Sequence, residues 1–274
     1  MNTAGARPLA FLLLLGSLGP GYAASLTLEF DASTRFSGGM ASARVTLTNQ
    51  GDEQAKSVYV EALLGDQRIS SSEIEALAVG ASHTWDIQLG PPPKRPGVYT
   101  VAFRAHYSDI YGHPASGLHT IPLYTGQVPA RSPIDARLSS ATIDPSGELM
   151  LSMGAKVAFT SDVTCRLILP SEILCNAPEI RLRISGVEPV EHRFAIENNG
   201  ALRGSRYRVY VVIDYVHDGL HGSTEEAALV EVAPHRKMQN TERNLWITII
   251  AALVIAFLAA QFFPRRRSGK IAEG

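Results

Sequence analysis

HTWDI at residues 83–87 and YTVAFRAHY at residues 99–107 are two strand-like segments, and they decide the fold because the chain repeats them. The second copy reads HRFAI at residues 192–196 and YRVYVVIDY at residues 207–215. Alternation of apolar and polar residues along such segments is typical of β-strands with one buried face. The aligned residues are Trp85 with Phe194, Ile87 with Ile196, Tyr99 with Tyr207, Tyr107 with Tyr215 and His113 with His221. This internal repeat predicts two similar β modules.

Strand patterns fill the region between the two hydrophobic ends of the chain. Turn-forming Gly, Pro, Asn and Asp separate them. The clearest predicted strands are residues 43–48, 57–64, 84–89, 99–107, 149–152, 155–160, 165–169, 181–184, 193–197, 207–215 and 227–232. About seven strands in roughly 100 residues is the immunoglobulin-like pattern. We therefore expect one module over residues 24–126, a linker over 127–134 and a second module over 135–233.

Three turn motifs of the first module carry a family resemblance. TNQG at residues 48–51, LAVG at 77–80 and PGVY at 96–99 follow one another around predicted strands. This order resembles the bacterial CARDB-type and related immunoglobulin-like modules of cell-envelope proteins. The resemblance covers residues 25–125 well and the second module more weakly, because Ser161-Asp162 replaces the Asn-x-Gly turn there. It implies an all-β fold of two tandem immunoglobulin-like (fibronectin III/CARDB-like) β-sandwiches, an envelope location, and binding or scaffolding as the role.

The N-terminal 23 residues have the pattern of a secretory signal peptide. Arg7 precedes an apolar run from Leu9 to Leu18, and small residues precede the expected cleavage after Ala23 or Ala24. An uncleaved membrane anchor is the other interpretation. The apolar run is short for a membrane span, which needs about 20 residues, so we expect cleavage.

A second apolar run, residues 245–263, predicts one transmembrane α-helix after a stalk at 234–244. It contains no charged residue and has a length that crosses a bilayer core of about 30 Å. Trp246 stands at its outer end as an interfacial anchor, and the 264–274 tail begins with the cluster Arg265, Arg266 and Arg267. We expect a single-pass type I protein of the cell membrane, with its modules in the bacterial periplasm and its tail in the cytoplasm.

Cys165 and Cys175 are the only cysteines of the chain, and both lie in the part expected to be exported. An oxidising compartment favours their pairing, so a disulfide across a hairpin or between neighbouring strands is predicted. Two free buried thiols are the other interpretation.

The sequence contains no motif for catalysis or for cofactor binding. Its formal net charge of −1 lacks the basic excess of a nucleic-acid-binding protein. We expect no enzyme activity, no cofactor and no metal site. His217 and His221 are the candidates for a metal site, since they flank one short loop, but an exposed hairpin with an Asp-Gly turn also explains them.

Polar and aromatic residues near the last hairpin of each module define a possible ligand face. Its members are Tyr107, Tyr111, His113 and His221. Aromatic rings stack on sugars, but Tyr in a strand is more often half-buried packing. Two functions remain open: a non-enzymatic accessory subunit that binds another envelope or integral membrane protein, and a module that binds envelope glycan or another surface polymer. A row of aromatic side chains on one exposed face would favour the second function.

Overall fold

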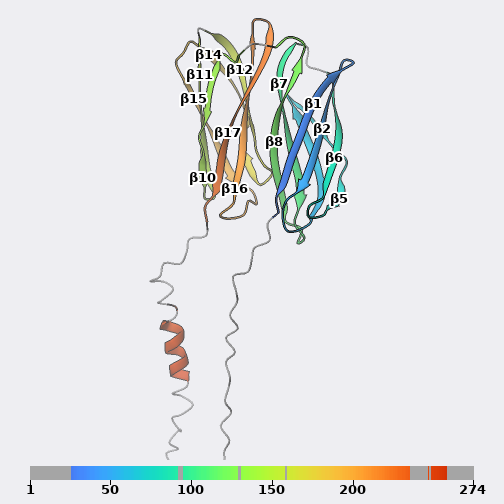
Figure 1. The fold of residues 1–274 in the computed structure, drawn as a ribbon. Helices are drawn as coiled ribbons and strands as arrows, with labels where there is room; N and C mark the ends of the chain where they lie inside the picture. The colour runs from blue at the N-terminus through green and yellow to red at the C-terminus, as the bar shows by residue number, and fades with distance from the viewer. Residues whose placement is uncertain are drawn as a thin grey trace, which may run out of the picture. The chain divides into compact units, whose positions relative to one another are not determined.

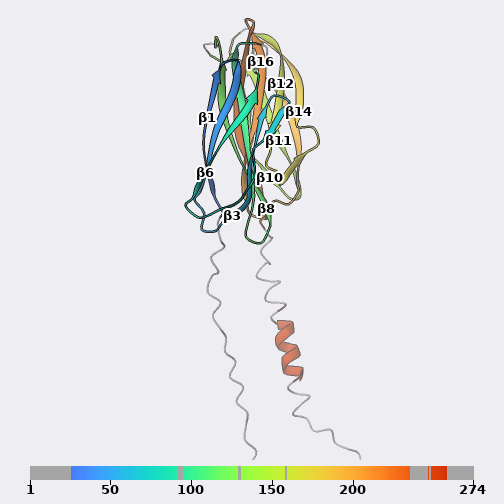
Figure 2. The same ribbon diagram turned by 90° about the vertical axis from the view of Figure 1, so that its right-hand side faces the viewer.

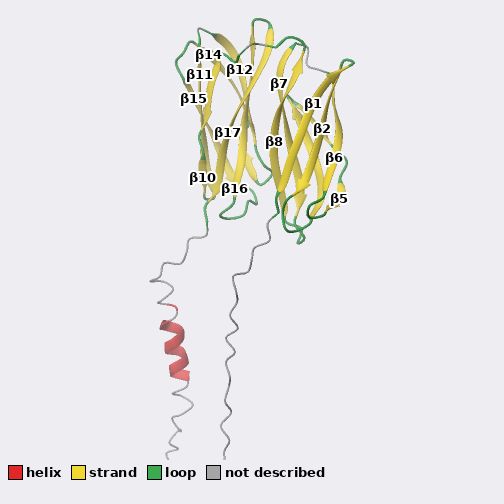
Figure 3. Cartoon of the chain, in the orientation of Figure 1, coloured by secondary structure: helices red, strands yellow, loops and turns green. Residues whose placement is uncertain are grey.

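The structure is a computed structural model that describes residues 26–91, 95–128, 131–157, 159–234, 246 and 248–257. The chain divides into two compact units, residues 1–232 and 233–274, and each is described by itself. The first unit is nearly all β, as predicted (Figure 3).

The first half of this unit contains eight strands in the described residues: β1 (Leu28–Ser37), β2 (Met40–Asn49), β3 (Ala55–Leu64), β4 (Gln67–Ser70), β5 (Ile74–Leu77), β6 (Ser82–Gly90), β7 (Gly97–Ser108) and β8 (Pro114–Thr125). One sheet has the order β1-β2-β6, and β3, β4, β5, β7 and β8 pair in the facing sheet. Alternation decides which side chains face inward: Val45 and Leu47 of β2 are fully buried, whereas Arg44 between the inward positions is exposed. A hydrophobic core therefore forms between these two sheets.

The second half repeats this arrangement with nine strands: β9 (Ile134–Leu138), β10 (Ala141–Ile143), β11 (Ser146–Ala155), β12 (Thr160–Ile168), β13 (Ile173–Cys175), β14 (Glu179–Ser185), β15 (Val190–Asn198), β16 (Arg206–His217) and β17 (Leu220–Val232). One sheet has the order β13-β15-β11-β9, and β14, β12, β16 and β17 are consecutive in the other. The two sheets enclose a separate hydrophobic core. In the repeat, β6, β7 and β8 correspond to β15, β16 and β17.

The aligned residues of the two repeat copies are equally buried in some pairs and differ in burial in others. Trp85 and Phe194 are both buried in their respective cores. Tyr99 is buried while its counterpart Tyr207 is half-buried, and Tyr107 is half-buried while Tyr215 is buried. The repeat thus predicted the strands correctly, but the surroundings of equivalent residues differ.

One predicted strand, residues 155–160, is wrong. Ala155 ends β11 and Thr160 begins β12, so this segment connects two strands instead of forming one. Phe159 packs into the core of the second half, and its burial explains the strand-like pattern.

The turn motifs of the first half are joined by hydrogen bonds. The buried Asn49 side chain donates from Nδ2 to the carbonyls of Glu53 and Leu77, and its Oδ1 accepts from the Gly51 amide. The Gly80 amide donates to the Asn49 carbonyl. Asn49 therefore ties the TNQG turn to the LAVG turn, which gives both motifs a structural role.

The two halves pack side by side through the outer faces of their β7- and β16-containing sheets (Figure 1). Leu63 of β3 and Ala102 of β7 contact Ile168, Tyr210 and Val212 of the second half in a small third core. At one corner β17 pairs with β7 in parallel, which merges these sheets into one of ten strands. The unit therefore has four β layers with three cores between them, and the long strands of both halves run along a common axis (Figure 2). We call the contact between the halves the seam.

The region after Val232 is described only in part. Trp246 and residues 248–257 are helical with exposed side chains. Within the described part of the chain, no helix has the length and apolarity needed to cross a bilayer. The predicted signal peptide at 1–23, most of the stalk at 234–244, the ends of the 245–263 segment and Arg265, Arg266 and Arg267 lie outside the described residues.

The predicted disulfide is wrong, since both cysteines are free. Cys165 lies on β12 and points into the core, where its thiol contacts Met153 Sδ at 3.4 Å. Cys175 lies on β13, which pairs with β15 in the opposite sheet of the same half. The chain between them crosses from one sheet to the other, so the two residues are not neighbours across a hairpin as the sequence spacing suggested.

Candidate functional site

The seam contains buried polar groups, and charged side chains line the cavities beside it, so it is the candidate functional site. Glu172, in the connection between β12 and β13, is only 4% exposed. Its carboxylate accepts hydrogen bonds from the Ser116 amide at 2.7 Å and the Ser116 hydroxyl at 2.5 Å, both on β8. The Ser116 hydroxyl oxygen in turn accepts from the Ser171 amide at 2.8 Å. A buried carboxylate with this many donors holds a loop of the second half against the first half.

A second polar junction lies where β17 meets β7. The His221 ring stacks on Tyr99 with centroids 3.8 Å apart, and its Nδ1 donates to the Val98 carbonyl at 2.7 Å. Ser223 Oγ bonds to Thr100 Oγ1 at 2.8 Å. Because of these contacts with Tyr99 and Val98 of the first half, His221 lies in the seam.

The two histidines named as metal candidates point to opposite sides of the β16–β17 hairpin. Val216 pairs with His221, and His217 pairs with Leu220, so strand alternation separates the two imidazoles. His217 packs edge-on against Phe159. Asp218 and Gly219 both have positive φ and form the two-residue turn expected of Asp-Gly.

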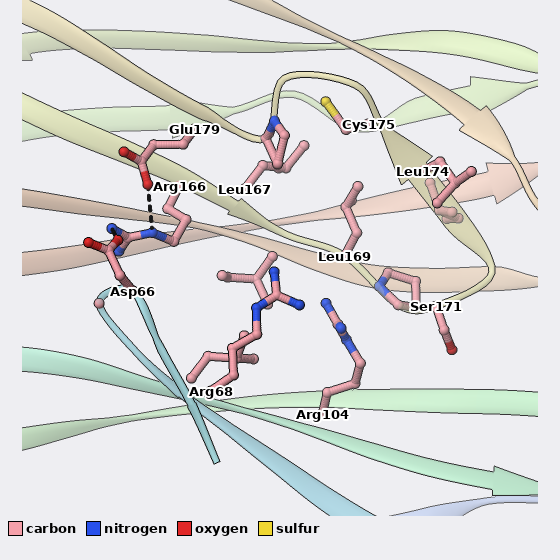
Figure 4. Close-up of a pocket in the computed structure, with 16 residues that line it drawn as sticks. Asp66, Arg68, Arg104, Arg166, Leu167, Leu169, Ser171, Leu174, Cys175 and Glu179 are labelled. Carbon is pink, nitrogen blue, oxygen red and sulfur yellow. Dashed lines mark hydrogen bonds and ion pairs between the residues drawn. The ribbon is translucent and has the colours of Figure 1, made fainter. Parts of the chain in front are cut away.

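A cavity of about 370 Å³ opens between the halves, and we call it the arginine cavity. Arg68 of β4, Arg104 of β7 and Arg166 of β12 line it. Figure 4 shows the ends of Arg68 and Arg104 side by side, with Arg166 beside Asp66 and Glu179. Its volume lies in the range of sites for small ligands.

The three arginines differ in how well their charge is matched. Arg166 is paired with three carboxylates: Asp66 at 3.1 Å, Glu179 at 3.2 Å and Asp214 at 3.2 Å. Arg104 and Arg68 instead share Glu61, at 3.1 Å and 4.0 Å. The Arg68–Arg104 pair therefore has fewer carboxylates within ion-pair distance than Arg166 has, and the Glu172 charge acts on Arg104 from further away.

Arg104 is also incompletely hydrogen-bonded. Its Nε is buried and has no partner among the described residues. Burial, and to a lesser degree the charge of Arg68, lowers the pKa of Arg104, while Glu61 acts in the opposite direction. Burial and the Arg104 charge likewise lower the pKa of His106, which lies 4.0 Å from Glu61. His106 is therefore neutral at pH 7 and adds no charge to this group.

The other side of the arginine cavity is apolar. Leu169, Ile173 and Leu174 line this side. Leu169 and Ile173 are only 6% and 2% exposed because they also pack in the core of the second half, whereas Leu174 is 48% exposed. Cys175 also lines the cavity, and burial raises the pKa of its thiol. The cavity thus places an apolar wall opposite two guanidinium groups.

The predicted ligand face is only partly assembled. Tyr107 and His113 line another cavity at the seam, of about 450 Å³. Tyr111 is 78% exposed and its ring centroid lies 6.2 Å from that of His113. His221 lines a different cavity with Tyr99 and does not join this group. Burial and the Glu172 charge raise the pKa of Tyr107 to about 12, so its hydroxyl stays protonated.

Sequence reasoning missed Arg68, Arg104, Arg166 and Glu172. A signal for one of them is present: Arg104 and its partner Glu61 interrupt the apolar strands 99–107 and 57–64. Charged residues inside such runs are rarely buried unless they are paired. They are directly opposite each other in the β3–β7 register, which the sequence alone did not reveal.

Comparison with known proteins identifies a CARDB family model that matches residues 24–110. This is less than half of the chain and stops before β8, which completes the first half. A search of the curated proteins found no match. The match supports the predicted CARDB-type, immunoglobulin-like character of the first half.

Solved structures of several kinds are similar to parts of the unit. Red sea bream transglutaminase aligns with a TM-score of 0.28 and 14% identity, covering 77% of this chain and 31% of that one. Trypsin-activated α-2-macroglobulin from Escherichia coli aligns with a TM-score of 0.29 and 8% identity, covering 76% and 18%. BcpA, the major pilin subunit of Bacillus cereus, aligns with a TM-score of 0.26 and 10% identity, covering 64% of each chain. The chain spans less than a third of the length of the first two.

Proposed function

We propose that the protein is a non-enzymatic extracytoplasmic binding or scaffold protein of the cell envelope, an accessory subunit of a membrane complex. On this proposal residues 1–23 direct export, and residues 245–263 hold the protein in the membrane. The two halves act as tandem immunoglobulin-like modules. The observation that carries the proposal is the seam, because it joins two separately cored halves into one body and leaves ligand-sized cavities between them.

A rigid pair of modules suits a role in positioning. The Glu172–Ser116 and His221–Val98 hydrogen bonds hold the halves in one arrangement, so a partner would meet a surface already in its binding geometry. Such preorganisation lowers the entropy lost on binding. Tethering to the same membrane as the partner raises the effective concentration, so a modest interface suffices.

Site-specific photocrosslinking of the full-length protein in its native membrane tests the proposal. A photoreactive residue replaces Leu174 at the arginine cavity, and in a matched control it replaces Gln88, an exposed residue of β6 on the outer sheet. We expect mass spectrometry to identify one integral membrane protein captured from position 174 and not from position 88. Capture of no protein from either position, or the same proteins from both, contradicts the proposal.

Binding of envelope glycan is the second candidate function. The observation in its favour is the exposed Tyr111 beside His113 at the rim of the 450 Å³ cavity. Against it, the exposed tyrosines Tyr111 and Tyr124 lie at opposite ends of β8, and no aromatic row runs across a face of the described residues. A glycan array with the wild type and Tyr111→Ala separates the two functions, since only the glycan function predicts a signal that Tyr111→Ala removes.

A further inference from the structure

We propose that the arginine cavity binds a carboxylate that is carried next to an apolar group, as in an acidic peptide segment or a small organic acid. The inference rests on the proposed binding function and names the chemistry that this site recognises. It follows from two neighbouring guanidinium groups with a single close carboxylate, the incomplete hydrogen bonding of Arg104 and the apolar residues of one cavity.

The charge of the cavity selects an anion. Arg104 and Arg68 share one carboxylate within 4.0 Å, Glu61, which is only 15% exposed, and the Glu172 charge acts on Arg104 from a longer distance. Arg68 is 4.0 Å from Glu61 and is 67% exposed, so this contact satisfies little of its charge. A ligand carboxylate between the two guanidinium groups would give Arg68 a closer partner than Glu61.

The hydrogen-bonding groups point to the same conclusion. Arg104 uses Nη1 to bind Glu61, while its Nε is buried without a partner among the described residues. A buried donor without an acceptor costs about 1–3 kcal/mol, so such groups in native proteins call for an explanation. Guanidinium groups bind carboxylates in a planar, two-point geometry, which Arg104 and Arg68 can offer from adjacent sides.

The surroundings limit the charge and shape of the ligand. Asp66 and Glu179 stand at the cavity beside Arg166, and their negative charges disfavour a multiply charged anion such as phosphate. Leu174, which is 48% exposed, provides most of the accessible apolar surface next to the carboxylate, and the largely buried Leu169 and Ile173 also line the cavity. A cavity of about 370 Å³ accommodates a ligand about the size of one or two amino-acid residues.

Ligand-observed NMR titration of the purified full-length protein tests this inference with small probes. N-acetyl-leucine carries a carboxylate beside an isobutyl group, and N-acetyl-leucinamide is its neutral match. We expect a Kd on the order of millimolar for the acid, given about 0.3 kcal/mol per heavy atom, and at least tenfold weaker binding of the amide. N-acetyl-Leu-Asp amide tests whether a side-chain carboxylate is recognised as well as a terminal one, which distinguishes a peptide segment from a small acid.

Three variants locate the binding. Arg104→Met keeps the apolar stem and should weaken binding of N-acetyl-leucine at least tenfold. Because this change also leaves Glu61 without its close partner, Arg68→Gln provides a second test at an exposed position and should weaken binding several-fold without lowering Tm. Arg137→Gln, at an exposed position on β9 in the outer sheet of the second half, is the matched control and should leave binding unchanged.

The inference is overturned if the amide binds as well as the acid, if inorganic phosphate binds more tightly than N-acetyl-leucine, or if Arg68→Gln and a folded Arg104→Met bind like the wild type. Its failure is distinguishable from failure of the proposed function. A protein that still captures a membrane partner from position 174 but binds no carboxylate retains the proposed function and lacks only this specificity.

Discussion

At the scale of single residues, the seam depends on polar side chains whose donors and acceptors are matched across it. Glu172 is the clearest case, because its carboxylate accepts hydrogen bonds from the Ser116 amide, the Ser116 hydroxyl and the Ser171 hydroxyl, and the first two come from the other half. When a buried acceptor such as Glu172 is removed, most of the free-energy cost comes from the buried amide or hydroxyl that is left without a hydrogen-bond partner. The seam is therefore sensitive to isosteric changes that a surface position would tolerate.

Replacing Glu172 with alanine should lower the free energy of unfolding by about 2 kcal/mol, because the buried Ser116 amide and hydroxyl lose their acceptor. Urea unfolding followed by fluorescence measures the change. Glu191→Ala, at an exposed position of β15, is the control and should shift the free energy of unfolding by less than about 0.5 kcal/mol. An equal effect of the two variants would show that Glu172 does not hold the seam.

The two thiols should differ sharply in reactivity. Burial raises the pKa of Cys165 to about 12, and the thiol faces Met153 in the core, whereas Cys175 is half-buried at the arginine cavity. The thiolate is the reactive species, so iodoacetamide at pH 8 should modify Cys175 first and Cys165 only after unfolding. Mass spectrometry of tryptic peptides measures both. If neither thiol reacts in guanidinium without a reductant, the cysteines are bridged and the free-thiol structure is wrong.

At the scale of elements, the start of β7 is the place where one strand serves both halves. Gly97 pairs with His221 of β17, and the His221 amide donates to the Pro96 carbonyl at 2.9 Å. A Cβ at position 97 would overlap the His221 backbone carbonyl. The glycine of the PGVY motif therefore permits the close approach of β7 and β17, in addition to forming a turn.

Gly97→Ala should destabilise the protein by about 3 kcal/mol, because backbone and not a flexible side chain occupies the space and β17 must move away. Thermal unfolding with amide hydrogen exchange at β17 measures the effect. Gly112→Ala is the matched control: its φ is +86° but no atom lies within 4 Å of the added Cβ, so only backbone strain of about 1 kcal/mol is expected. Unchanged exchange at β17 in Gly97→Ala contradicts this role.

At the scale of the whole molecule, the described β strands form one body with three cores. Leu63 and Ala102 from one half and Tyr210 and Val212 from the other exclude water from the middle of the seam. Contacts between domains of one chain are often small and polar, which permits relative motion. Here an apolar centre, buried hydrogen bonds and a shared sheet act together, so the halves should unfold as a single cooperative unit.

Calorimetry of the full-length protein should therefore show one transition for the β unit. Val212→Asp places an unpaired charge in the centre of the seam and should split this transition in two, because each half retains its own core. Leu229→Asp, at an exposed apolar position on the neighbouring strand β17, should leave one transition at a similar temperature. Two transitions already in the wild type would show that the halves are independent.

Local patterns were sufficient to predict the all-β fold, the positions of most long strands and the repeat. Residues such as Ile87 and Ile196 alternate with polar neighbours, and alternation depends only on which side of a strand meets water. The ten-residue strand β1 was missed, and so were the short strands β4, β5, β9, β10 and β13, whose three to five residues carry too little pattern. The disulfide was expected across a hairpin or between neighbouring strands, and spacing along the chain does not show that Cys165 contacts Met153 in the core while Cys175 lies on β13 of the other sheet.

The seam and its cavity could not be inferred in this way, because they arise from contacts between residues far apart in the sequence. Arg166 and Asp66 are separated by 100 positions, and Glu172 and Ser116 by 56. Arg166 and Glu172 look like ordinary surface residues until the outer faces of two sheets pack together and remove them from water. Whether a side chain faces the core of its own module follows from the alternation along its strand, which is a local property of the sequence. Whether a side chain is buried by the other module depends on how well the two surfaces fit together.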